Sequence, residues 1–128
     1  MFFQSLPIIK NCQLIRLIHS DVYAGLNYLP DNSVDIAITS PPYWGQRDYG
    51  FIGQIGCEDD YKEYIGKLIA IFRVLKDKLK DDSVFFLNIG DKYIPRYGKS
   101  SLGLIPYKIA YFVNYPPPIE VEACKSLS

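Results

Sequence analysis

Residues 29–50 read LPDNSVDIAITSPPYWGQRDYG, and the pattern of this stretch is the clearest indication of the fold class. Its apolar part, VDIAIT at Val34–Thr39, predicts a strand that is apolar enough to be buried on both faces. An irregular stretch rich in glycine and aromatic residues follows, from Ser40 to Cys57. The sequence therefore places a proline-containing loop directly at the carboxyl end of a buried strand.

Strands and helices alternate on both sides of this stretch. A second and a third strand are expected at Gln13–His19 and Val84–Ile89. Helices are expected at Val22–Leu29, Asp59–Leu79 and Leu102–Val113. The long helix at 59–79 opens with acidic residues and closes with lysines, the polarity that the helix dipole favours. This order is typical of an α/β fold with a parallel sheet and right-handed crossovers.

Three polar or glycine-rich segments follow the three predicted strands: Ser20-Asp21, Ser40–Gly50 and Gly90-Asp91. Ligands of parallel α/β sheets bind beyond the carboxyl ends of the strands. We therefore expect these segments to converge. Asn88 and Asp91 either line the resulting pocket or serve as buried polar and turn residues.

The composition limits the classes of function. The chain has 128 residues, which fits one small domain, and its 14 basic and 14 acidic residues give a formal net charge of zero. A free-standing duplex DNA binder normally carries a basic surface, so any contact with nucleic acid must be local or be helped by another part of the protein. The three cysteines form no CxxC pair and the chain has a single histidine, so no metal site is expected.

Two features of the sequence bear on the cellular location that we expect for the protein. No apolar run approaches the roughly 20 residues that a membrane span needs. The start, Met1–Ile9, lacks the basic leader and cleavage site of a signal peptide. We expect a cytoplasmic protein whose catalytic domain part covers residues 1–113. Residues 114–128 read either as an irregular proline-rich tail or as the place where a longer reading frame was truncated or frameshifted.

The motif Ser40-Pro41-Pro42-Tyr43 after a buried strand resembles the catalytic motif of DNA amino-methyltransferases, which modify the exocyclic nitrogen of cytosine or adenine. The likeness extends through residues 29–50 and through FFLNIGD at 85–91, and it covers about residues 13–113. It implies a Rossmann-like methyltransferase fold with S-adenosylmethionine as the methyl donor and no metal. It also implies double-stranded DNA with a flipped target base as the substrate.

The chemistry explains the residue types of the motif. The lone pair of an exocyclic amine is delocalised into the ring, so acceptors against its N–H groups are needed to make it nucleophilic. We assign these acceptors to the Ser40 hydroxyl and a carbonyl of the Ser40-Pro41 segment. Pro41 and Pro42 remove competing N–H donors and hold Ser40 extended. Serine rather than aspartate or asparagine at this position favours cytosine over adenine.

The aromatic and basic residues after the prolines are candidates for contact with DNA. Tyr43 is expected to stack on the flipped base. Trp44 is either a pocket wall or a packing residue, and Arg47 either contacts the DNA or is a solvated loop charge. Asp21 and Ser40 are assigned to the cofactor side, where Asp21 resembles the family's contact to the adenine of S-adenosylmethionine. Asp21 is also a good helix N-cap, and both roles are compatible.

One family feature is missing from the sequence. The glycine-rich FxGxG segment that holds the methionine part of the cofactor occurs nowhere in the chain. In one branch of the family the SPPY motif comes first, so the chain resembles the N-terminal part of such an enzyme, with a C-terminal half or a cognate restriction enzyme as partner. The alternatives are a truncated inactive fragment, a partner-dependent subunit, or an RNA or protein-glutamine methyltransferase.

Overall fold

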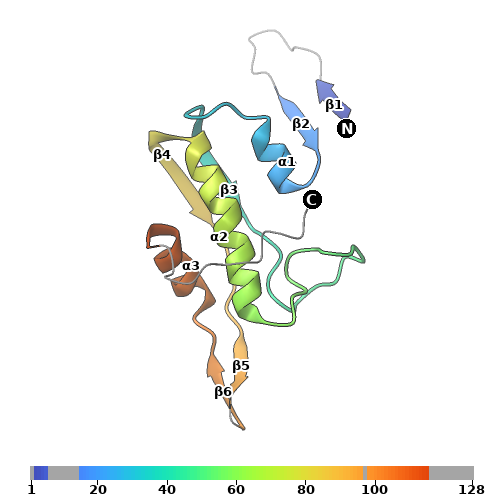
Figure 1. Cartoon of the computed structure of the whole chain (residues 1–128), viewed down its shortest axis with the longest axis vertical. Coiled ribbons are helices and arrows are strands. Elements are labelled where there is room, and N and C mark those ends of the chain that lie inside the picture. The colour runs from blue at the N-terminus through green and yellow to red at the C-terminus, as the bar shows by residue number, and fades with distance from the viewer. Residues whose placement is uncertain (1, 6–14, 97, 116–128) are drawn as a thin grey trace.

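The computed structural model describes residues 2–5, 15–96 and 98–115 (Figure 1). Its elements in chain order are β1 (Phe2–Ser5), β2 (Arg16–His19), α1 (Val22–Asn27), β3 (Val34–Thr39), α2 (Tyr61–Lys78), β4 (Leu79–Leu87), β5 (Tyr93–Arg96), β6 (Lys99–Leu102) and α3 (Ile105–Asn114).

The predicted elements are present with shifted ends, and the largest shift is in β4, which begins at Leu79 rather than at the predicted Val84. The strand at 34–39 is confirmed at its predicted bounds, and the long helix begins and ends within two residues of the prediction. The first predicted strand is seen at 16–19, and its start at 13–14 lies outside the described residues. The tail predicted from residue 114 also lies outside them from residue 116 on. The hairpin of β5 and β6 was not predicted.

The sheet is smaller than the sequence predicted. β3 and β4 pair in parallel, with Ala37 opposite Phe85 and Thr39 opposite Leu87, and α2 forms the connection between them. β2 does not join them: it pairs antiparallel with β1, so the prediction of three strands in one parallel sheet is wrong for the described residues. The described chain is a mixed α/β structure with one parallel strand pair, not a complete Rossmann fold. Strand periodicity indicates a strand but not its partner, which explains the error.

The hydrophobic core lies between α2, one face of the β3–β4 pair, and α3. Asp60 caps α2 by accepting a hydrogen bond from Lys62 N at 2.9 Å. The helix buries Tyr64, Ile65, Leu68, Ile69, Ile71, Phe72 and Leu75, and α3 adds Ile105 and Ile109. Phe72 meets Phe85 of β4 edge to face, with ring centroids 5.0 Å apart. None of the helices in the described part of the chain has the length and apolar composition to cross a membrane.

The opposite face of the β3–β4 pair is uncovered. Four apolar side chains make up this open sheet face, with exposed fractions of 59% for Ile36, 78% for Ile38, 47% for Val84 and 55% for Phe86. The register pairs them across the two strands, so they form one continuous surface. The prediction that the strand at 34–39 is buried on both faces is therefore wrong for the part of the chain that the structure describes. The reason is that α2 covers one face and no described element covers the other.

We expect the open sheet face to make the chain associate. Replacing Ile38 and Phe86 together with threonine should reduce dye binding by 8-anilinonaphthalene-1-sulfonate and light scattering. It should change the free energy of unfolding by less than about 1 kcal/mol, because each exposed substitution costs within about 0.5 kcal/mol. Urea unfolding measures the stability.

Phe85→Ala is the matched control on the covered face, where loss of an aromatic side chain from the core costs about 3 kcal/mol. The one-sided arrangement would be contradicted if the exposed double substitution destabilised the chain as much as Phe85→Ala.

Candidate active site

The SPPY motif (Ser40–Tyr43) lies where the sequence predicted, directly after β3. Ser40 is exposed, while the two prolines and Tyr43 are half-buried. Parallel pairing continues to this point, because Asn88 N donates to Thr39 O at 2.9 Å. The motif therefore sits at the carboxyl end of the strand pair, the edge at which α/β proteins bind their ligands.

Tyr43 packs over the segment that follows β4. A Cβ atom placed on Gly90 would lie 3.0 Å from Tyr43 Cδ2 and 3.1 Å from Tyr43 Cε2. The absence of a side chain at Gly90 thus lets the tyrosine ring lie against the backbone. This contact brings together two of the three segments that were expected to converge.

The third segment, Ser20-Asp21, has only local hydrogen bonds in the described structure. Asp21 caps α1, with Oδ1 accepting from Ala24 N at 3.1 Å, and its side chain is exposed. The N-cap reading of Asp21 is confirmed, and its contact with a cofactor stays a prediction. Asp91 also has a structural role, because its Oδ1 accepts from Lys92 N at 2.8 Å and from Ile105 N at 3.2 Å.

Trp44 is a packing residue in this structure. Its Nε1 donates to Glu58 O at 2.8 Å, and its ring meets Tyr61 edge to face at 6.0 Å between centroids. Lys92 Nζ lies 4.8 Å from the centroid of the Trp44 ring. Arg47 is exposed on the same loop, as either of its readings requires.

A side chain of α2 anchors the loop that carries the motif (residues 40–57, here the motif loop) to the core. Tyr64 is fully buried, and its hydroxyl donates to Pro42 O at 3.0 Å. Within the loop, Gly45 N donates to Gly56 O at 2.6 Å. Gly56 has φ +99°, and a Cβ there would lie 3.2 Å from Pro42 Cβ, so glycine is required at this close approach.

The helical spacing of apolar residues at 61, 65, 68, 72, 75 and 79 predicts Tyr61, and not Tyr64, on the buried face of the long helix. In the structure Tyr61 is half-buried and Tyr64 is fully buried. Only a general rule could have pointed to Tyr64 from the sequence. A buried tyrosine hydroxyl usually has a hydrogen-bond partner, and the carbonyls of the motif loop are candidate acceptors.

A buried carboxylate completes the support of the motif loop. The Glu58 side chain is 1% exposed, and its Oε2 accepts from Gly56 N at 2.8 Å. Lys67 Nζ lies 3.2 Å from Glu58 Oε1 and 3.1 Å from Glu63 Oε1. Burial by itself lowers the pKa of Lys67, but the hydrogen bonds and charges of Glu63 and Glu58 outweigh it and raise that pKa. Lys67 therefore stays charged and neutralises the buried glutamate.

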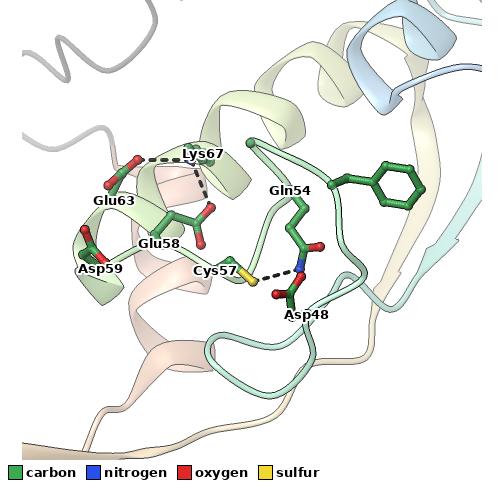
Figure 2. Close-up of a pocket in the computed structure, with 9 residues that line it drawn as sticks. Asp48, Gln54, Cys57, Glu58, Asp59, Glu63 and Lys67 are labelled. Atoms are coloured by element: carbon green, nitrogen blue, oxygen red, sulfur yellow. Dashed lines mark hydrogen bonds and ion pairs between the residues drawn. The ribbon is translucent and has the colours of Figure 1, made fainter.

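Figure 2 shows the hollow in which these groups lie, between the motif loop and the start of α2. It is lined by Asp48, Phe51, Gly53, Gln54, Cys57, Glu58, Asp59, Glu63 and Lys67. Four carboxylates against one ammonium make it unsuited to phosphate groups, and no residue of the SPPY motif lines it. Within the described ranges no group of three or more His, Cys, Asp or Glu residues is arranged to hold a metal ion.

A family model for N6 and N4 methyltransferases, described as DNA methylase, matches residues 34–115. The chain belongs to this DNA methylase family. The match begins at β3 and includes the motif loop, the strand pair and α3. The comparison therefore rests on the same segments that build the candidate site.

Relatives in the DNA methylase family include Type II methyltransferases. The chain is 63% identical over 95 residues to Type II methyltransferase M.MwoI of Methanothermobacter wolfeii, covering 74% of this chain and 14% of that protein. It is 45% identical over 84 residues to Type II methyltransferase M.SmaI of Serratia marcescens, covering 66% of this chain and 29% of that protein. The chain thus spans less than a third of either relative. No solved structure matches the chain significantly.

The bond from Tyr64 to Pro42 gives a testable link between the core and the motif. Tyr64→Phe should lower the free energy of unfolding by about 0.5–1.5 kcal/mol, the net value of one hydrogen bond. It should also change the fluorescence of Trp44, the single tryptophan of the chain, because the motif loop is released. Urea unfolding followed by tryptophan emission measures both. Tyr107→Phe, at a side chain that is 73% exposed, is the matched control and should change neither.

The same hydroxyl makes stability depend on pH. Burial first, then the charge of Glu58 and the neighbouring Tyr43, raises the pKa of Tyr64 from 10.0 to about 12. Between these values the unfolded chain has lost the Tyr64 proton and the folded chain has kept it, so stability falls as pH rises. The parent should lose stability in this window more steeply than Tyr64→Phe. Parallel pH profiles would rule out the buried hydrogen-bonded state of Tyr64.

Proposed function

We propose that this chain carries the catalytic loop of a site-specific DNA methyltransferase that uses S-adenosylmethionine. In this proposal it methylates the exocyclic amino group of cytosine, with adenine as the second choice. The observation that carries the proposal is the SPPY motif at the carboxyl end of a parallel strand pair, with the Tyr43 ring against Gly90. Membership of the DNA methylase family supports DNA as the substrate. Serine at the first motif position supports cytosine.

The proposed role of Ser40 is to accept a hydrogen bond from the target amine. Its exposed position at the end of β3 allows a base to approach. A second acceptor is a carbonyl of the Ser40-Pro41 segment. The prolines contribute no N–H donors that would occupy these acceptors, and they restrict the backbone, so the acceptors are held in place before the base arrives. Two such bonds pull the amine toward a tetrahedral geometry with an available lone pair.

Tyr43 is proposed to stack on the flipped base. Stacking on an aromatic side chain is worth about 1–3 kcal/mol, comparable with the cost of unstacking a base from the duplex. The packing of its ring on Gly90 supports this role, because the ring is oriented before the base arrives. Exposed Arg47 is proposed to contact the DNA backbone. Trp44 is proposed to hold the motif loop in place through its hydrogen bond to Glu58 O.

S-adenosylmethionine, when bound, supplies an electrophilic methyl group on a sulfonium. The described residues fit this group at one end only. Asp21 presents an exposed carboxylate at the start of α1 that is able to accept from an adenine amino group. We identify no glycine cradle for the methionine part, as the sequence lacks FxGxG. We therefore propose that Asp21 holds the adenine end and that the other contacts come from a C-terminal half supplied by a further segment or subunit.

A partner-dependent subunit is the second candidate function, and the open sheet face favours it. The four apolar side chains of that face are adjacent across β3 and β4 and lack a covering element among the described residues. Covering them with a further segment would complete a second layer on the sheet, which parallel sheets normally have. In this candidate the chain provides the catalytic loop and its partner provides the cofactor site.

The function is tested by grafting the matching residues of this chain into M.MwoI, where they are 63% identical over 95 residues. The graft should incorporate tritiated methyl groups into DNA, and mass spectrometry of the nucleosides should find N4-methylcytosine. Ser40→Ala should reduce turnover by at least about tenfold, or about 1.4 kcal/mol, with smaller loss of DNA affinity, because the lost acceptor acts on the reacting amine. Tyr107→Phe, which removes a hydroxyl from a side chain of α3 that is 73% exposed, is the control and should keep full activity.

N6-methyladenine as the only product would overturn the choice of cytosine and leave the methyltransferase proposal intact. Unmethylated DNA from a folded graft would overturn the proposal itself.

The isolated chain should bind S-adenosylmethionine weakly. One hydrogen bond from Asp21 contributes about 0.5–1.5 kcal/mol net, whereas micromolar binding requires about 8 kcal/mol. Calorimetric titration of the chain alone should therefore detect no micromolar binding. Binding should return when the C-terminal part of M.MwoI is added. Micromolar binding by the chain alone would contradict the proposed division of the cofactor site.

A further inference from the structure

The positive charge of the chain is unevenly distributed along the sequence. The segment from residue 92 to residue 115 contains Lys92, Arg96, Lys99 and Lys108 and no aspartate or glutamate. Because the whole chain has a formal net charge of zero, this segment carries +4 and the remainder carries −4. The neutral overall charge therefore conceals a basic region of the kind that contacts phosphates.

The front of this segment forms a projecting hairpin. β5 and β6 pair antiparallel with each other, with Tyr93 opposite Leu102 and Arg96 opposite Lys99. In the described residues neither strand joins another sheet, and Figure 1 shows the hairpin extending away from the helices. Tyr93 is 66% exposed, and all four residues of β6 are exposed, while Ile94 is half-buried. Most of the hairpin that the structure describes is therefore accessible to a partner.

The base of the hairpin is fixed to the candidate active site. Lys92 Nζ donates to Gly45 O of the motif loop at 3.3 Å and lies over the Trp44 ring. Asp91 Oδ1 accepts from the N–H groups of Lys92 and Ile105, which lie on the two sides of the hairpin. A partner held by the hairpin would therefore lie next to the SPPY motif.

We propose that the β5–β6 hairpin is a DNA-backbone contact that holds the duplex beside the target base. The proposal rests on the proposed function, because a base can be swung into the motif only if its flanking duplex is held. The register places Arg96 opposite Lys99 next to the turn, so the end of the hairpin carries two of the four positive charges of the segment, and Lys99 is exposed. The hollow at the start of α2 cannot serve this purpose, because Asp48, Glu58, Asp59 and Glu63 line it. The hairpin thus supplies the local nucleic-acid contact that a neutral chain needs.

The test is the salt dependence of binding to a fluorescently labelled duplex, measured by anisotropy with the whole chain between about 30 and 200 mM salt. Each phosphate contact contributes about 0.9 to the slope of log K against log salt concentration. The double variant Arg96→Gln/Lys99→Gln should lower the magnitude of the slope by about 1.8 if both residues contact phosphates. The variant with Lys62→Gln/Lys76→Gln, two exposed lysines of α2, changes the net charge equally and should keep the parental slope.

Two further measurements make the result decisive. Lys99→Arg keeps the charge and should keep the slope, and circular dichroism should show that all variants are folded. An unchanged slope in the hairpin variant, an equal loss in the α2 variant, or no duplex binding by the parent would each overturn the hairpin proposal. A stronger preference of the parent for single-stranded RNA than for the duplex would also overturn it.

Failure of the proposed function is visible separately in the methyl-incorporation assay on the M.MwoI graft. A graft that methylates DNA while the hairpin variant keeps its slope leaves the methyltransferase proposal standing without the hairpin. If the graft fails to methylate DNA while the hairpin variant lowers the slope, the hairpin contact stands and the methyltransferase proposal fails.

Discussion

Backbone pairing between β3 and β4 determines where the residues of the candidate active site lie. The ladder runs to Thr39 opposite Leu87, and Asn88 N still donates to Thr39 O beyond it. Because the strands are parallel, the segments that follow them leave the sheet at the same edge, so Tyr43 comes to lie on Gly90. A shift of one residue in the register would turn the apolar side chains to the other face and move the motif loop away from α2.

A small set of buried polar contacts then gives the motif loop one shape. Tyr64 and Glu58 both lie in the interior, and each makes a hydrogen bond to loop backbone, at Pro42 O and at Gly56 N respectively. A buried donor or acceptor that loses its partner costs more than an average hydrogen bond contributes, so such contacts oppose alternative loop conformations. The raised pKa of Tyr64, about 12 instead of 10.0, keeps its hydroxyl a donor at alkaline pH values at which an exposed tyrosine would ionise. The shape of the loop is thus maintained from the core side, while Ser40 and Arg47 remain exposed.

The strand pair is buried on one side only, so the described core is confined to that side of the sheet. α2 and α3 cover one face, and the open sheet face keeps Ile38 at 78% exposure. Large exposed apolar patches mark interaction surfaces or aggregation sites. The chain spans 14% of M.MwoI and 29% of M.SmaI. The projecting basic hairpin lies outside the core, at the edge that carries the motif.

Local sequence determined the element types and the chemistry-bearing loop. The strand at 34–39, the capped helix at 61–78 and the SPPY motif between them follow from short-range patterns of apolar, acidic and proline residues. Such patterns depend on neighbours within one or two turns, which is why they could be read from the chain alone.

Tertiary structure alone decided three other features. These are the pairing of β2 with β1, the full burial of Tyr64 rather than Tyr61, and the exposure of Ile36 and Ile38. Each of these features depends on which strand edge or helix face, distant in the sequence, packs against the residue. Hydrophobic periodicity indicates that a helix or strand has an apolar face to bury. That face is covered only if a second element packs against it.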